Sequence, residues 1–293
     1  MDPGLSIEAG RVRGMAEPST GASDPRRWPV LAHAALKRSG QAWLVVTLFG
    51  QFVFAAYVAM FYGGAALAGE YERWSEVLPR GYVGGDLVGN AMLGLHLLLA
   101  VALVVGAALQ LTPALRRHAP AFHRWNGRTY VASAAVLAIG GLWLVWVRGG
   151  AAGDLSQHVA ISINAALIVG CAGVAWRAAR SRRFDDHARW ALRLFVAASG
   201  VWFFRVGLMA WLAVHRRPAG FDPVTFQGPF LTVLAFGVYV VLPLALLQLY
   251  FAALDRGGAV ARAGVAALIG VVTAVTAGGV LVATMGLWLP RMQ

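Results

Sequence analysis

The most regular feature of the chain is a series of long apolar runs separated by short polar segments. Each run is long enough to cross a bilayer, which takes about 20 residues of helix. Lipid offers the backbone no hydrogen-bond partners, so such spans must be helical. We therefore predict an all-α, polytopic membrane helix bundle with seven transmembrane helices, at residues 42–67, 89–112, 128–148, 158–179, 190–214, 227–252 and 263–289.

Composition supports one membrane domain rather than several soluble ones. Hydrophobic residues make up 59% of the chain and charged residues 13%, against about a quarter charged in soluble domains. We assign the transmembrane bundle to residues 41–290. Residues 1–40, where Gly, Ser, Pro and charge gather, are interpreted as a disordered basic cytoplasmic tail.

The distribution of positive charge predicts the orientation of the bundle. A net charge of +12 would suggest nucleic-acid binding in a soluble protein. Here the basic residues concentrate in alternate connections, which is how membrane topology is encoded. The rich segments are the N-terminal tail, the second connection and the fourth connection. We therefore predict a cytoplasmic N-terminus, an outside C-terminus, contact with the lipid bilayer and no nucleic-acid partner.

Four of the seven histidines fall in or beside spans two to five, one in each. By depth they form two couples, His96 with His158 towards the outside and His123 with His187 towards the inside. Two imidazoles that face each other across a helix bundle can hold the iron of a b-type haem. The layout therefore predicts haem b at two bis-histidine sites, between helices two and four and between helices three and five.

Arg205 is the most unusual charged residue, because it lies inside span five and no carboxylate lies in any predicted span. A guanidinium keeps its charge. Its partner is therefore Asp86 or Asp154 at the outer edge, a backbone carbonyl, or a bound group such as a haem propionate or a quinone oxygen.

Three further arginines flank the inner histidines, and we predict that they hold propionates or an anionic donor: Arg124, Arg128 and Arg189. A simpler interpretation remains open for them and for the neighbouring tryptophans. Arginine at a helix end reaches the lipid headgroups, and tryptophan prefers the membrane interface. That interpretation leaves the histidines unexplained.

The motifs resemble a known family. LGLH (93–96), HRWNGRTY (123–130) and HARWALR (187–193), followed by Arg205, resemble the DUF2306 family of bacterial membrane proteins over about residues 45–215. The departures are Ala191 and Leu192, where methionine is common. This resemblance implies a helical fold and a multi-pass location in the bacterial inner (plasma) membrane.

The histidine layout is separately similar to cytochrome b561 and related di-haem membrane cytochromes. This similarity implies haem and electron transfer. In those proteins the ligands lie inside the spans, whereas His123 precedes predicted span three.

Two functions remain open at this point, and no catalytic residue is identified. The first is a b-type haem electron-transfer protein or oxidoreductase that exchanges electrons with a quinone or another redox partner. The second is a non-enzymatic membrane binding or assembly protein, whose basic inner motifs dock anionic lipid headgroups or a partner. A transporter is disfavoured, because matching pairs of broken helices and internal repeats are not evident.

Overall fold

The computed structural model describes residues 27–78, 80–149 and 153–292. Helices of several kinds dominate these residues, and within them the only β-pairing is an isolated bridge between Asp222 and Gln227. The predicted all-α class is confirmed.

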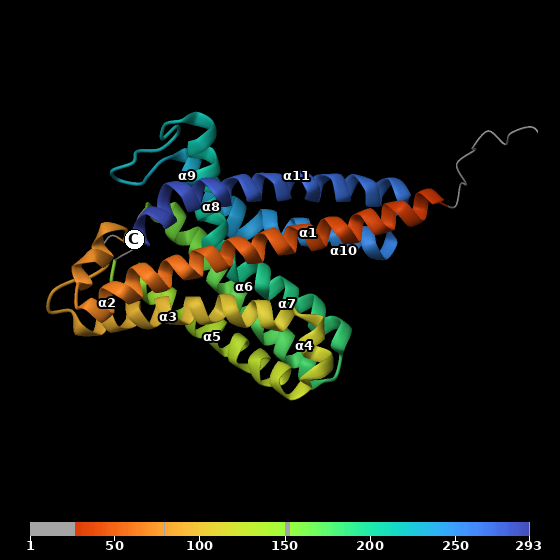
Figure 1. Cartoon of the computed structure of the whole chain (residues 1–293), viewed down its shortest axis with the longest axis horizontal. Coiled ribbons are helices and arrows are strands. Elements are labelled where there is room, and N and C mark those ends of the chain that lie inside the picture. Colours follow the sequence, from red (N-terminus) through yellow and green to blue (C-terminus); the bar gives the residue numbers. More distant parts are fainter. Residues whose placement is uncertain (1–26, 79, 150–152, 293) are drawn as a thin grey trace, which may run out of the picture.

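The membrane-crossing segments follow one another along the chain, as Figure 1 shows. Their bounds are α1 (Arg27–Val58), η1 (Ala59–Gly63) and α2 (Gly64–Ala68); α3 (Leu87–Leu111); α5 (Pro120–Trp146); α6 (Leu155–Arg180); α7 (Phe184–Ala198) and α8 (Gly200–His215); α9 (Pro229–Phe236), η3 (Gly237–Val241) and α10 (Leu242–Arg256); and α11 (Ala259–Ala283), η4 (Thr284–Trp288) and η5 (Leu289–Arg291). Short helices η2 (Tyr71–Glu76) and α4 (Pro113–His118) lie in connections. Six segments are long and apolar enough to cross a membrane, and the bent pair α7–α8 makes up to seven.

The first helix starts earlier than the hydropathy predicts. The expectation of a disordered tail is wrong for residues 27–40, because α1 already begins at Arg27. Ala32 and Leu36 are 2% and 0% exposed, and Leu36 packs in a cluster with Ala253 and Ile269 of α10 and α11. This packing stabilises helical structure before residue 42, where the predicted apolar span begins. Residues 1–26 of the predicted tail lie outside the described residues.

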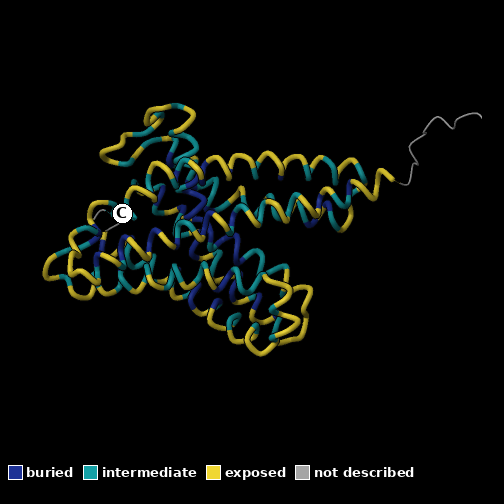
Figure 2. The backbone as a smooth tube through the Cα atoms, in the orientation of Figure 1, coloured by how far each residue is buried: buried dark blue, intermediate teal, exposed yellow. Residues whose placement is uncertain are grey.

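Helix pairs build the bundle around a central crossing. In Figure 1, α1 runs beside α11, α3 beside α5, and α6 beside α7. Buried positions gather where these helices cross, as Figure 2 shows, while the outer faces are exposed. The largest fully buried side chains include Trp288, Phe61 and Leu194. The exposed outer faces remain apolar, as a lipid solvent requires.

The fifth span is broken rather than straight. Helices α7 and α8 meet at Ser199 with an angle of 50°. Side chains from two other helices bond polar groups at this bend. Asn164 of α6 donates to the carbonyl of Ala197 (3.1 Å) and also to that of Tyr239 in η3 (2.9 Å), and Gln51 of α1 donates to the Ser199 hydroxyl (2.7 Å). Hydropathy alone predicted one span over 190–214 and did not reveal the bend.

A buried arginine ties the end of α5 to the start of α3. Arg148 is 7% exposed, and its Nε lies 3.5 Å from Asp86 Oδ2. Its guanidinium also donates to Asn90 Oδ1 (2.6 Å) and to the Gly89 carbonyl. Arg80 donates in turn to the Arg148 carbonyl (3.0 Å). Arg148 therefore helps to fix the connection that precedes α3, together with Asn90, which makes two bonds with the Val83 backbone.

We expect Arg148→Ala to lower the midpoint of thermal unfolding clearly, because it removes the cation beside Asp86 and the donors to Asn90 and to the Gly89 carbonyl. Removing one partner of a buried ion pair costs about 3–5 kcal/mol, and the 36% exposure of the Asp86 side chain places the expected cost below that range. Thermal unfolding in detergent, followed by circular dichroism, measures the effect. Arg128→Ala is the control, since Arg128 is exposed. Equal midpoints for the two variants would contradict the assigned role of Arg148.

Candidate ligand site between the two histidine motifs

The structure brings the two inner histidines to the same end of the bundle. His123 lies in the first turn of α5 and His187 in the first turn of α7, because both helices begin several residues before the apolar spans. Each is thus inside a helix, which corrects the expectation that His123 precedes its span. The starts of α5 and α7 lie at the same end of the bundle in Figure 1.

Each motif contributes a small residue one turn after its histidine. Gly127 follows His123, and Ala191 follows His187, at the i, i+4 spacing that puts both on one helix face. A cavity of about 40 Å³ lies between the helices at this level. It is lined by Ala107, Gln110, Leu111, Gly127, Tyr130, Val131, Ala175, His187, Ala191, Leu194 and Phe195.

The cavity is small for a cofactor. Its volume suits a few water molecules, whereas pockets for drug-sized ligands measure roughly 300–1,000 Å³. A porphyrin does not fit between these side chains as they stand. Haem bound by His123 and His187 stays a prediction, and it requires the lining side chains to move apart.

Polar contacts hold the site together from α3. Asn126 donates to the Gly106 carbonyl and to Gln110 Oε1, both at 2.9 Å. This fixes the Gln110 amide, so that its nitrogen points at His123 Nε2 (3.2 Å). The amide nitrogen donates, and the His123 proton then resides on Nδ1, which has no partner among the described residues.

The second histidine is held by the backbone. His187 Nδ1 lies 3.0 Å from the Ala175 carbonyl of α6, so Nδ1 carries the proton. The bond leaves Nε2 as the atom available to a ligand. Proteins orient a metal-binding histidine by a hydrogen bond from its other ring nitrogen to an acceptor such as a backbone carbonyl.

The outer histidines contact different parts of α5. His96 packs against Gly140 and Gly141, where an added Cβ would lie 3.4 Å from its ring. His158 packs edge-on against Trp146, with ring centroids 5.8 Å apart. Within the described residues, no hydrogen bond or ring contact joins the two histidines. A haem between them stays a prediction.

Both carboxylates expected for Arg205 are engaged elsewhere. Asp86 pairs with Arg148. Asp154 caps α6, accepting from Ser156 (2.5 Å) and from the Gln157 N–H (3.1 Å), and these bonds hold the pKa of its carboxyl below the usual range. Arg205 instead donates to the Val201 carbonyl (3.3 Å). Among the described residues Arg205 thus pairs with neither carboxylate and bonds a backbone carbonyl, while a bound group as its partner stays a prediction.

The arginines of the motifs have different surroundings. Arg189 makes a bidentate ion pair with Asp255 of α10, at 2.7 and 2.8 Å, which occupies the group expected to hold a propionate. Arg128 lies over the Trp125 ring at 5.0 Å. Arg124 is exposed. The role of all three towards a ligand stays a prediction.

The comparisons match the motif-bearing part of the chain. A family model described as "Predicted membrane protein (DUF2306)" matches residues 93–241, about half of the sequence. The chain belongs to the DUF2306 family. The matched region runs from α3 to η3 and includes both histidine motifs, Arg205 and the break at Ser199. No curated protein matches, and no solved structure does. Family and fold together make this DUF2306 protein a multi-pass integral membrane protein.

Two polar residues of the bundle escaped the sequence analysis. Asn126 sits inside the HRWNGR motif, but nothing in the sequence showed that it bonds α3. Asn164 is 3% exposed and supports the break at Ser199. An amide within an apolar helix is a usable signal, because it needs an internal partner in lipid.

We expect Gly127→Ala to lower the thermal midpoint relative to Gly170→Ala. Each change favours the helix by up to about 1 kcal/mol. A Cβ at Gly127, however, would lie 2.8 Å from Gln110 Nε2, while Gly170 has nothing within 4 Å. The added methyl group therefore displaces Gln110 from His123.

A third variant isolates this contact. In a Gln110→Ala background the clash is gone, so Gly127→Ala should behave as Gly170→Ala does. If the deficit of Gly127→Ala persists in that background, the contact with Gln110 is not its cause.

Proposed function

We propose that this DUF2306 protein is a non-enzymatic membrane binding protein that holds anionic phospholipid headgroups at the end of the bundle where its two motifs meet. The proposal rests on a group of exposed arginines, which we call the basic rim. Its members are Arg116, Arg117, Arg124, Arg128, Arg177, Arg180 and Arg182.

The basic rim comes from neighbouring elements. In Figure 1, α4, the start of α5 and the turn between α6 and α7 lie at one end of the molecule. Among the described residues, no rim arginine takes part in an ion pair. Repulsion among unpaired like charges favours the binding of anions, which headgroup phosphates supply.

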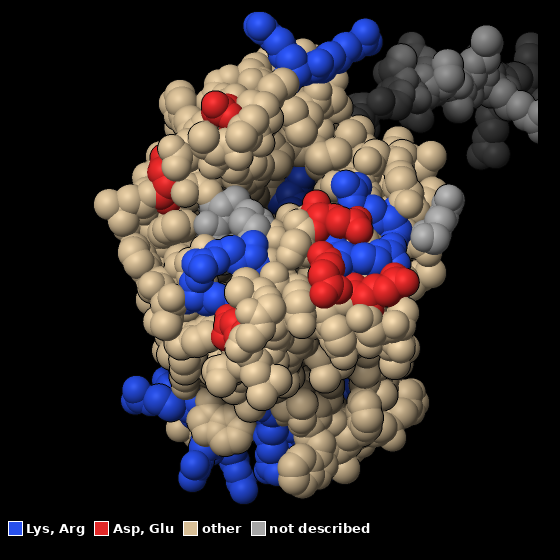
Figure 3. All heavy atoms as spheres, turned by 90° about the vertical axis from the view of Figure 1, so that its left-hand side faces the viewer, with Lys and Arg blue, Asp and Glu red and all other residues tan. Residues whose placement is uncertain are grey.

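The opposite end has a different character. Figure 3 faces it and shows acidic side chains grouped with basic ones. There Arg73 pairs with Glu70 (3.3 Å) and Glu76 (3.8 Å). The positive charge of Arg73 is largely neutralised. The basic rim is therefore the stronger attraction for anionic lipid.

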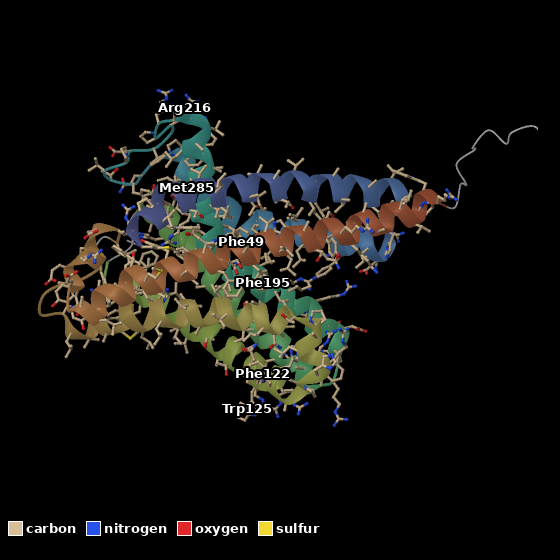
Figure 4. All side chains as sticks on the ribbon, viewed as in Figure 1. Phe49, Phe122, Trp125, Phe195, Arg216 and Met285 are labelled. Carbon is tan, nitrogen blue, oxygen red and sulfur yellow. The ribbon has the colours of Figure 1, made fainter. Side chains whose placement is uncertain are left out.

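Aromatic side chains mark the rim as a membrane interface. Figure 4 places Phe122 and Trp125 at the foot of α5, pointing out of the bundle. They are 47% and 66% exposed. The Arg128 guanidinium lies over the Trp125 ring. The pair therefore presents an apolar surface to the lipid and a cation to the headgroups.

We expect the combined variant Arg116→Gln, Arg117→Gln and Arg124→Gln to lose its preference for anionic lipid. Each arginine near an anionic surface contributes about 1 kcal/mol, so the preference should fall at least about tenfold. Spin-labelled phosphatidylglycerol and phosphatidylcholine, compared by electron paramagnetic resonance on the reconstituted protein, measure it.

A matched control removes charge elsewhere. Arg216 and Arg217 follow α8 and are exposed, and Figure 4 places Arg216 far from Trp125. Arg216→Gln with Arg217→Gln should keep the wild-type preference. An unchanged preference in the rim variant, or an equal loss in both variants, would contradict the proposal.

Haem is the second candidate, supported by the first-turn positions of His123 and His187 on two helices that start at the same end of the bundle, and by His187 Nε2, which has no hydrogen-bond partner among the described residues. A bound haem would supply one-electron chemistry between a quinone or another redox partner and an acceptor. The chain would supply two imidazoles that hold the iron, and the Ala175 carbonyl orients one of them.

The expected spectrum separates the inner couple from the outer one. Protein expressed with haem supply should show a Soret band and a sharp reduced α-band, both lost in His123→Ala and in His187→Ala. If the outer couple binds no haem, His96→Ala keeps the wild-type amount per chain. A colourless, folded wild-type protein would exclude this second candidate.

A further inference from the structure

Arg205 has more hydrogen-bonding capacity than the protein uses. A guanidinium carries five N–H donors, and the described residues provide one contact, the 3.3 Å bond to the carbonyl of Val201. The group also lies over the Phe54 ring, 5.3 Å from its centroid. Arg205 is half-buried, so part of the cation remains accessible from outside the bundle.

Two further donors belong to side chains that pack against Phe54. Tyr57 lies one turn after Phe54 on α1, with ring centroids 6.1 Å apart, and Trp288 of η4 packs against Phe54 in a tilted arrangement, with ring centroids 5.3 Å apart. These two residues are 3% and 0% exposed. The Tyr57 hydroxyl and the Trp288 indole nitrogen have no partner among the described residues.

No carboxylate of the described residues neutralises Arg205. Asp86 and Asp154 are bonded elsewhere, and none of the ion pairs in the described residues involves Arg205. Arg205 and the two unpartnered donors therefore share one need: an anionic group that accepts their hydrogen bonds.

The chemistry of the surroundings selects the kind of anion. A planar guanidinium fits a carboxylate with two parallel bonds, and a hydroxyl or an indole N–H adds a neutral donor. Arg205 carries one positive charge, which a monoanion balances, and a carboxylate presents that charge on two coplanar oxygens that match the guanidinium. The walls are aromatic and aliphatic, including Phe54 and Phe61, so the remainder of the ligand must be apolar.

We propose that Arg205, with Tyr57 and Trp288, forms a second site that binds the carboxylate of a single-chain amphiphile such as a long-chain fatty acid. The acyl chain lies along the lipid-facing surface of the bundle, while the carboxylate reaches the half-buried guanidinium. This site is separate from the basic rim, both in its residues and in the class of ligand.

Binding of tritiated palmitate tests the proposal. The full-length protein is placed in nanodiscs of phosphatidylcholine, and scintillation proximity measures saturable binding. We expect Arg205→Gln to weaken binding at least about tenfold, since hydrogen bonds to a charged group contribute about 1.5–3 kcal/mol. Tyr57→Phe should weaken it by a smaller factor, about threefold, as the loss of one hydrogen bond does.

Controls distinguish the site from partition into lipid. Hexadecanol, which has the chain without the charge, should not compete. The variant with Arg116→Gln, Arg117→Gln and Arg124→Gln should bind palmitate as the wild type does, which separates this site from the basic rim. Arg205→Lys covers the case in which Arg205→Gln fails to fold, and its binding should be weakened but measurable.

Three results would each overturn the proposal. They are the absence of saturable palmitate binding, unchanged binding by both Arg205 variants, and competition by hexadecanol equal to that by palmitate.

Discussion

The whole fold follows from one constraint: every polar group inside a lipid-facing bundle must find its partner within the protein. The break at Ser199 is where this requirement is most demanding, because a bend frees backbone carbonyls among apolar helices. Asn164 meets it by bonding two carbonyls at once, those of Ala197 and Tyr239. Gly200 makes this possible, since a Cβ there would lie 3.0 Å from Tyr239 and 3.1 Å from Asn164.

The same constraint explains the two ends of the bundle. At the start of α3, the Arg148 guanidinium bonds Asn90 and pairs with Asp86. At the motif end, Asn126 and Gln110 form a chain of amides that leads to His123. Polar groups thus bond the helices to one another near their ends, while small residues such as Gly127 and Ala191 allow close approach between them.

Sequence analysis predicted the fold class and the number of spans, because long apolar runs have few alternatives in a membrane. It also placed His123 and His187 at the same end of the bundle, since alternating topology puts the starts of helices three and five on one side; their pairing around a ligand stays a prediction. Helix starts were less predictable: the hydropathy of residues 27–40 is interrupted by polar residues, yet Leu36 is fully buried. The rotation of each helix about its axis decides whether His96 and His158 face each other. The hydropathy of an apolar span does not reveal this rotation.

The two arms of the divided fifth span pack against different helices. Its first arm, α7, is fastened to α10 by the ion pair of Arg189 with Asp255 and by the bond of Arg193 to Gln248. Its second arm, α8, is pressed onto α11, where the backbone of Val206 leaves no room for a Cβ at Gly279. The bend at Ser199 therefore lets one span pack against two different helices. The segment that bears His187 is held by α10, whereas the segment that bears Arg205 is held by α11, so the two polar regions of the span have separate structural supports.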